Sequence, residues 1–275
     1  MALAEAGLEQ VLPAGIVADF RDQLPPFIRE YYGKWVGHDY PAPGVIRHVA
    51  ADGTECWTLR LYLPPGGMLS SSTLRLLARW IREYARVGRR TSRQAFELVG
   101  VDPSRLTDLV EEVRRAGFLP GGTGAALKQV KACVGYLHCQ NALVDSPGLA
   151  RVLGDALLQV ARDGLPAGLR VSVAGCPNDC GGAQGADLGL VGWFRGGPRV
   201  CLYAGGRAGA EPRLGQDLEF LPVCPPEYGQ VVARVVELVE RWRGAARQGE
   251  RLGEWLARTQ GFPGRVDRRA ERGEM

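Results

Sequence analysis

The chain has 275 residues, of which 45% are apolar and 23% are charged, so it can bury a sizeable core in one large domain or two modest ones. Its net charge of +4 is too small to indicate a protein that binds nucleic acid or a membrane surface. No apolar stretch is long enough to cross a bilayer, and the amino-terminal region lacks the features of a secretory signal. These features predict a cytoplasmic protein.

Hydrophobic periodicity predicts strands and helices that alternate along the first half of the chain. Strands are expected at 45–50, 55–62 and 91–99, and helices at 70–88 and 103–117. The pair Asp52-Gly53 favours a hairpin between the first two strands. Two helices on one face of a small antiparallel sheet give an α+β layer.

The second half is expected to hold one helix, three strands and then two helices. The helix is expected at 147–162, the strands at 169–174, 187–193 and 199–203, and the late helices at 227–242 and 250–259. Four segments follow from this reading: an amino-terminal extension (1–19), a first domain (20–120), a second domain (121–262) and a charged tail (263–275).

Four of the seven cysteines form two close pairs, Cys133 with Cys139 and Cys176 with Cys180. A disulfide framework is not expected in a chain without a secretory signal, because a reducing compartment keeps thiols free. Metal ligation or burial is therefore left as the role of these cysteines. Glycines around both pairs let the backbone bend closely, as a cuboidal iron–sulfur cluster requires. The spacings favour such a cluster over a structural zinc site, for which a gap of five residues is wide. Four buried cysteines are the third possibility. The remaining cysteines, Cys56, Cys201 and Cys224, are expected to be small buried side chains.

Several strings in the chain resemble the sirohaem-dependent sulfite and nitrite reductases. The spacing Cys-x5-Cys followed by Cys-x3-Cys is one, and the segment Arg89-Arg90-Thr91-Ser92-Arg93-Gln94 is another. More narrowly, the chain resembles the beta subunit of dissimilatory sulfite reductase. Further similar strings are Tyr32-Gly33-Lys34-Trp35, Gly135-Tyr136-Leu137-His138-Cys139, Leu165-Pro166-Ala167-Gly168-Leu169-Arg170 and Glu250-Arg251-Leu252-Gly253-Glu254-Trp255.

The resemblance implies a ferredoxin-like half-domain with helices on an antiparallel sheet, followed by a mixed α/β domain that binds sirohaem and a [4Fe–4S] cluster. It implies that the four paired cysteines ligate the cluster and that Cys180 also ligates the sirohaem iron. The chain departs from the family in lacking the inserted ferredoxin domain. It also has Gly168 where other family halves carry a lysine.

The implied activity is reduction of sulfite towards sulfide, or the reverse reaction. The implied partners are an alpha-like subunit, most simply in an α₂β₂ complex, and an external electron donor protein. The alternatives are a subunit that holds cofactors without catalysing, a nitrite reductase subunit, and a plain electron carrier.

Basic residues are the candidates for binding substrate and cofactor, because arginine binds oxyanions through a planar, permanently charged fork. Arg89 and Arg93 are expected on one strand face, with Arg89 towards sulfite and Arg93 towards a sirohaem carboxylate. Lys128 and Arg170 are expected to position sulfite or donate protons. The resemblance adds three cofactor-binding candidates: Thr91, Gln94 and Arg207.

Overall fold

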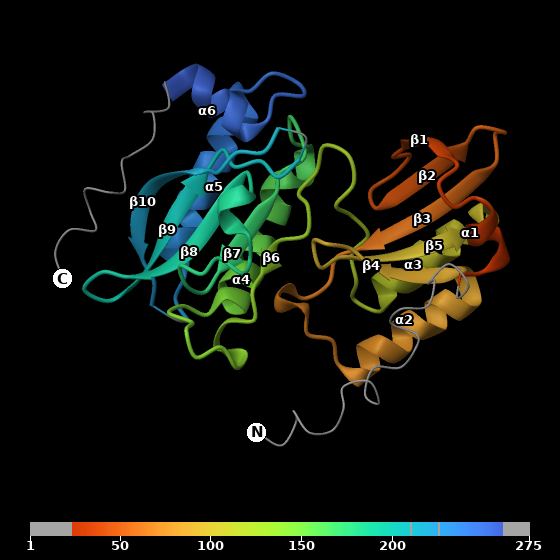
Figure 1. The fold of residues 1–275 in the computed structure, drawn as a ribbon, viewed down its shortest axis with the longest axis horizontal. Coiled ribbons are helices and arrows are strands. Elements are labelled where there is room, and N and C mark those ends of the chain that lie inside the picture. Colours follow the sequence, from red (N-terminus) through yellow and green to blue (C-terminus); the bar gives the residue numbers. More distant parts are fainter. Residues whose placement is uncertain (1–23, 210, 225, 261–275) are drawn as a thin grey trace, which may run out of the picture.

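The structure is a computed structural model that describes residues 24–209, 211–224 and 226–260. The predicted extension 1–19 and the tail 263–275 lie outside the described residues. The described chain forms two sheets side by side, each with its own helices and its own hydrophobic core (Figure 1).

The first sheet is antiparallel throughout, with strand order β1-β2-β3-β5-β4. Its strands are β1 (Trp35–Asp39), β2 (Val45–Ala50), β3 (Glu55–Leu61), β4 (Val87–Arg90) and β5 (Phe96–Val101). The helices of this half are α1 (Pro26–Glu30), α2 (Ser71–Tyr84) and α3 (Leu106–Arg115). The predicted hairpin 45–62 and both predicted helices are present, whereas β1 was not predicted.

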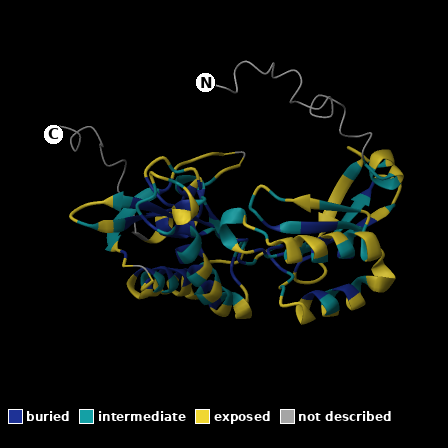
Figure 2. Ribbon diagram, turned by 90° about the horizontal axis from the view of Figure 1, so that it is seen from below, coloured by how far each residue is buried: buried dark blue, intermediate teal, exposed yellow. Residues whose placement is uncertain are grey.

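Alternation along β3 separates the core of this sheet from its other face. Leu59 and Leu61 are fully buried and belong to the core that includes Trp80 of α2 and Leu109 of α3. Arg60 lies between them and therefore points to the opposite face. The outer surfaces of α2 and α3 are exposed, whereas the central strands β3 and β5 contain buried residues (Figure 2). One face of the sheet is thus covered by helices, and the other carries Arg60.

The predicted strand 91–99 is wrong over residues 91–95, where the chain turns between β4 and β5, and is confirmed from Phe96 onward. The Thr91 Oγ1 accepts hydrogen bonds from the backbone N–H groups of Arg93 (3.3 Å) and Ala95 (3.1 Å), and Gln94 adopts a left-handed conformation with φ of 67°. The helix predicted to reach residue 88 ends at Tyr84. Arg89 therefore lies in β4 and Arg93 in the turn, so they do not share a strand face.

The second sheet is mixed, with order β10-β9-β8-β7-β6. Its strands are β6 (Lys131–Ala132), β7 (Val171–Ala174), β8 (Leu188–Phe194), β9 (Pro198–Ala204) and β10 (Gln216–Pro222). Strands β6, β7 and β8 run parallel, and β8, β9 and β10 run antiparallel. The helices are α4 (Ser146–Val160), α5 (Gly229–Ala245) and α6 (Leu252–Gln260). Short 3₁₀ turns occupy Pro65–Gly67, Pro103–Arg105, Gly135–Leu137, Ala161–Asp163 and Ala183–Gly185. The predicted α+β class, with an antiparallel half followed by a mixed one, is confirmed.

The chain between the two sheets hydrogen-bonds back to β3 and the residues that follow it. The Tyr62 hydroxyl donates to the Leu127 carbonyl (2.5 Å). The Gln129 side chain accepts from the Leu63 N–H and donates to the Leu63 carbonyl, both at 2.8 Å. The predicted domain boundary at residues 120 and 121 lies close to these hydrogen-bonded segments and stays a prediction. In the described part of the chain, no helix combines the length and apolar character needed to span a bilayer.

Candidate cofactor and substrate site

The four paired cysteines converge because of how β6 and β7 are placed. These strands are parallel neighbours, with Ala132 opposite Val173, so their carboxyl ends lie at the same edge of the sheet. Cys133 follows β6 directly, and Cys176 follows β7 after one glycine. Loops at the carboxyl ends of parallel strands are where α/β sheets hold ligands. The strand geometry thus delivers one cysteine of each pair to one edge.

All four cysteines line a single cavity of about 230 Å³, together with Gly66, Gln94 and Gly175 among others. Cys176 is buried, Cys133 and Cys139 are half-buried, and Cys180 is exposed. Among the described residues, no three His, Cys, Asp or Glu side chains are placed to hold a single metal ion. Four thiols around a cavity of this size fit a multi-atom cluster better than one zinc ion.

Hydrogen bonds hold the cysteine loops in place. The Gly175 N–H donates to Cys133 Sγ at 3.1 Å, and the Ser146 Oγ lies 3.0 Å from the same sulfur. In the second loop, the Asp179 carboxylate accepts from the N–H groups of Ala183 (2.6 Å) and Gln184 (3.0 Å). Donors to a cluster thiolate tune its reduction potential, so this cradle is suited to a redox cluster.

A second cavity, of about 180 Å³, is strongly basic. Its lining includes Arg60, Arg89, Arg93 and Lys128. The turn between β4 and β5 borders both cavities, because Thr91 and Arg93 line the basic one and Gln94 lines the cysteine cavity. The two cavities are therefore neighbours on either side of one turn.

Two buried carboxylates pair with basic side chains: Glu97 with two that line this cavity, and Asp187 with one that does not. Glu97, which is 2% exposed, pairs with Arg60 (2.6 Å) and Arg89 (2.5 Å). Asp187, which is 2% exposed, pairs with Arg251 (2.5 Å) and accepts from the Arg170 N–H (2.9 Å). Burial raises the pKa of Asp187. Sequence reasoning missed all four of these contacts and named neither acid.

Of the five predicted basic candidates, Arg89 and Arg207 form ion pairs with carboxylates. The other three, Arg93, Lys128 and Arg170, form none with the described residues. Burial, with Arg170 as a further cause, lowers the pKa of Arg93 to about 10. Burial, together with the positive charges of Arg60, Arg170, Arg93 and Arg251, lowers the pKa of Lys128 to about 8. Such uncompensated charge is costly unless an anion binds beside it. The arrangement therefore favours a polyanionic ligand.

Lys128 fills the space beside Gly168. Its Nζ donates to the Gly124 carbonyl at 2.6 Å. A Cβ atom added to Gly168 would lie 2.9 Å from Lys128 Cε and 3.4 Å from Nζ. The amine of Lys128 thus occupies the space into which a longer side chain at position 168 would grow.

The other predicted cofactor residues have contacts within the chain. The Gln94 side chain donates to the Ala132 carbonyl (2.7 Å) and accepts from the Ala132 N–H (3.1 Å), which fastens the turn to β6. Arg207 pairs with Glu211 (3.2 Å) and lies 3.8 Å from Glu254. Arg207 does not line the basic cavity, and direct cofactor contacts by Thr91, Gln94 and Arg207 stay predictions. Of the other cysteines, Cys56 and Cys201 are buried as predicted, but Cys224 is exposed.

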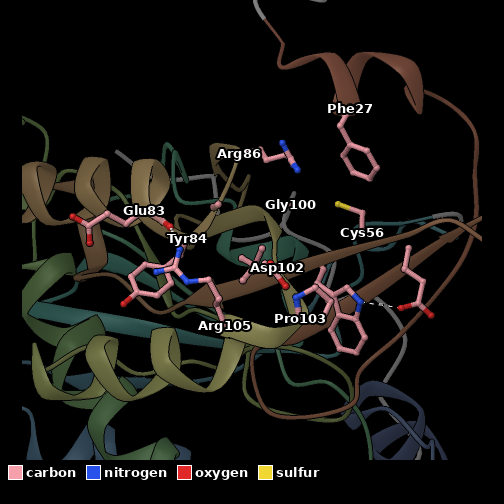
Figure 3. Close-up of a pocket in the computed structure, with 13 residues that line it drawn as sticks. Phe27, Cys56, Glu83, Tyr84, Arg86, Gly100, Asp102, Pro103 and Arg105 are labelled. Carbon is pink, nitrogen blue, oxygen red and sulfur yellow. Dashed lines mark hydrogen bonds between the residues drawn. The ribbon is translucent and has the colours of Figure 1, made fainter.

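A larger cavity, of about 480 Å³, lies at the other end of the first sheet and shares no lining residue with the two above. Phe27 and Arg86 face each other across its mouth, and the Cys56 thiol lies below them (Figure 3). It is lined at β3 by residues 55–57, whereas the basic cavity is lined by Arg60 of the same strand. This cavity is separate from the cysteine site.

The family model described as "Nitrite and sulphite reductase 4Fe-4S domain" matches residues 123–261, just over half of the chain. The chain belongs to this family. The model described as "Nitrite/Sulfite reductase ferredoxin-like half domain" matches residues 48–116. The first match covers the cysteine loops, and the second covers most of the first sheet.

Two curated relatives are beta subunits of dissimilatory-type sulfite reductase. The one from Archaeoglobus fulgidus is 28% identical over 87% of this chain and 85% of its own length. The one from Nitratidesulfovibrio vulgaris is 30% identical over 66% of this chain and 49% of its own length. These relatives agree with the resemblance seen in the sequence.

A solved structure titled dissimilatory sulfite reductase I has the same fold. It has a TM-score of 0.73 and 15% identity, and the match covers 86% of this chain and 80% of that one. The likeness supports the two-sheet architecture of this family member.

Arg60 could have been found in the sequence. It alternates with Leu59 and Leu61 in an apolar strand, so its side chain had to leave the core on the opposite face. Glu97 gave the same signal between Phe96 and Leu98. Asp187 and Arg251 gave none, because their pairing joins β8 to a loop 64 residues away.

Proposed function

We propose that this chain is a sulfite reductase subunit of the beta type, which holds a [4Fe–4S] cluster and sirohaem and acts on sulfite. The observation that carries the proposal is the pair of cavities that meet at the turn 91–95. One has four cysteine thiols on its walls and the other has four basic side chains. A cluster beside an anionic tetrapyrrole needs this combination of donors. The sirohaem, when bound, supplies the iron at which sulfite is reduced.

The residues present fit both groups. Cys133, Cys139, Cys176 and Cys180 would ligate the cluster, since they line one cavity with glycine walls. Cys180 would also be the link to the sirohaem iron, because it is the exposed member of the four. Arg93 would pair with a sirohaem carboxylate, since it is half-buried without a carboxylate ion pair among the described residues.

Sulfite binding falls to the remaining basic groups of the pocket. Arg89 keeps 64% of its side chain exposed and can present part of its guanidinium to an oxyanion. Lys128 would hold sulfite and donate protons, because an amine with a pKa of about 8 is charged at neutral pH and releases a proton readily. Arg170 lies just before β7 and does not line the basic cavity, but its charge acts on Lys128 and would add to the attraction for an anion. Lys128 in this way supplies the positive charge that Gly168 lacks.

We infer that the chain works with an alpha-like partner, most simply as α₂β₂. Cys180 is exposed, and so are Tyr136 and Leu137 of the first cysteine loop, at 50% and 54%. An exposed redox site beside apolar side chains is a surface that a partner normally covers. Electrons would come from a separate donor protein. The free thiols of Cys133, Cys139, Cys176 and Cys180 support a cytoplasmic setting.

Co-expression with an alpha-like chain tests this assembly. We expect size-exclusion chromatography with light scattering to show a stable hetero-oligomer that reduces sulfite with an artificial reductant. The chain alone should lose sirohaem or turn over poorly, because its redox site is open to solvent. A monomer that retains sirohaem and reduces sulfite at the rate of the complex would contradict the need for a partner. A complex that retains sirohaem but never reduces sulfite would indicate a cofactor-holding subunit. A complex that reduces nitrite in preference to sulfite would indicate a nitrite reductase subunit.

Replacing Lys128 by arginine should change the pH dependence of sulfite binding. In the wild type, the amine is charged below its pKa of about 8 and neutral above it, so sulfite affinity should fall as the pH rises through about 8. Arginine stays charged, so the Lys128→Arg variant should lack this fall. The measurement is KM for sulfite from pH 6.5 to 9.5 in both proteins. Identical pH profiles of KM in the two proteins would show that Lys128 does not bind sulfite.

Replacing Arg93 by alanine should weaken sirohaem retention more than it slows turnover per bound sirohaem. A charge-assisted hydrogen bond to a carboxylate typically contributes about 1.5–3 kcal/mol, which corresponds to a loss of affinity of about tenfold or more. The measurement is sirohaem per chain after extended gel filtration. Arg82→Ala serves as the control, because Arg82 lies on the exposed surface of α2. Equal sirohaem content in both variants would contradict the role of Arg93.

A further inference from the structure

Glu97 sits at the centre of a row of three charged residues across the first sheet. In the strand register it lies opposite Arg60 of β3 on one side and opposite Arg89 of β4 on the other. Its Oε1 accepts from Arg60 Nε (2.8 Å), and its Oε2 accepts from Arg89 Nε (2.8 Å) and Nη2 (2.5 Å). One carboxylate therefore holds two arginines.

The two arginines are held differently. Arg60 also donates from Nη1 to the Gly122 carbonyl (2.9 Å), so its guanidinium is engaged on both sides and is tied to the chain between the sheets. Arg89 is held along the single edge formed by Nε and Nη2, and its side chain is 64% exposed. The hydrogen bonds to Glu97 thus fix the guanidinium of Arg89, and the Nη1 edge of Arg89 is directed away from the carboxylate.

A buried negative charge beside an anion site needs an explanation. By charge alone, Glu97 should repel sulfite and weaken its binding. Without Glu97, however, Arg60 and Arg89 would face each other across β5 with no counter-charge, and the exposed Arg89 would be free to swing into solvent. Preorganised donors bind and stabilise anions better than mobile ones.

We propose that Glu97 is the positioning residue that orients Arg89 towards sulfite. The inference deepens the proposed function and rests on it. Glu97 acts through Arg89 and does not touch substrate. Removal of the Glu97 charge has opposite expected effects on KM for sulfite under the two explanations. KM should fall if repulsion by the charge dominates, and it should rise if orientation of Arg89 dominates.

A double-mutant cycle in the holo-complex tests the proposal. We expect Glu97→Gln to raise KM for sulfite by about tenfold with kcat changed less, because the charge-assisted grip is lost at constant side-chain size. Arg89→Ala should raise KM at least as much. The double variant should have a KM no higher than that of Arg89→Ala alone, since Glu97 then has no Arg89 to orient and only its repulsive charge is removed. Glu97→Asp keeps the charge and should restore part of the wild-type KM.

Glu112 provides a matched control in the same half of the molecule. Its carboxylate pairs with Arg79 and accepts from Trp80 Nε1 (3.0 Å) and the Tyr84 hydroxyl (2.8 Å), in the layer of α2 and α3. Glu112→Gln should alter thermal stability without changing KM for sulfite. If Glu97→Gln acted only through a general loss of stability, Glu112→Gln would shift KM for sulfite in the same way.

A second readout does not depend on turnover. Arginine Nε–H signals in ¹⁵N NMR spectra of the chain should exchange slowly for Arg60 and Arg89, and Glu97→Gln should speed their exchange. A lower KM in Glu97→Gln, or additive effects in the cycle, would overturn the positioning role while leaving the proposed function intact. An Arg89→Ala variant with an unchanged KM would overturn it as well. A wild-type complex without sulfite reduction, despite slow Nε–H exchange, would overturn the proposed function itself.

Discussion

Replacing Cys176 or Cys139 by serine should abolish the iron–sulfur cluster. The four cysteines line one cavity, and a serine oxygen is a poor substitute for a thiolate on iron. We expect the anaerobically purified variants to lose iron, acid-labile sulfide and brown colour. They should also lose sirohaem, because Cys180 would no longer be held beside its iron. The measurement is iron and sulfide per chain, together with the visible absorbance.

Cys224→Ser is the matched control for this experiment. Cys224 is exposed and does not line the cysteine cavity. Its replacement should leave iron and sulfide content at the wild-type level. Full iron and sulfide in both the Cys176 and Cys139 variants would show that the assignment of ligands is wrong.

Replacing Gly192 by alanine should disrupt the same cradle without touching a ligand. Gly192 lies in β8 behind the cysteine loop, and an added Cβ would lie 2.3 Å from the Gly175 carbonyl oxygen. That carbonyl accepts from the N–H groups of Leu143 (2.7 Å) and Val144 (3.2 Å), and the N–H of Gly175 donates to Cys133 Sγ. The clash is with backbone, so the loop must move.

We expect Gly192→Ala to lower the free energy of unfolding by about 1–3 kcal/mol or more, as overpacked cores do, and to reduce cluster content. Gly154→Ala is the control, because an added Cβ there lies 3.7 Å from its nearest neighbour, in helix α4. That change should be neutral or stabilise the helix by up to about 1 kcal/mol. Thermal unfolding and iron content measure both effects. Equal cluster content in the two variants would contradict the close packing of β8 against the cysteine loop.

Local signals in the sequence predicted most of the elements near the site. The hairpin at 45–62 followed from alternation and an Asp-Gly turn, and the cysteine pairs indicated the cluster before any strand was placed. The segment 91–99 was misread because Thr91 and Gln94 make a turn through side-chain and left-handed backbone geometry, which apolar periodicity does not register.

The partners of the basic residues could not be predicted from spacing. Glu97 meets Arg60 and Arg89 only because β5 lies between β3 and β4, which is a property of strand order. The space beside Gly168 is filled by Lys128, 40 positions earlier in the chain. Such contacts depend on tertiary packing, so the sequence could name the basic candidates but not which of them are held by acids.

The most direct test of the account is the optical and EPR spectrum of the anaerobically purified complex, recorded before and after addition of sulfite. We expect tetrapyrrole bands together with iron–sulfur absorbance, and a ferric sirohaem EPR signal that changes when sulfite is added. Iron–sulfur absorbance without any tetrapyrrole, or a sirohaem signal that sulfite leaves unchanged, would contradict it.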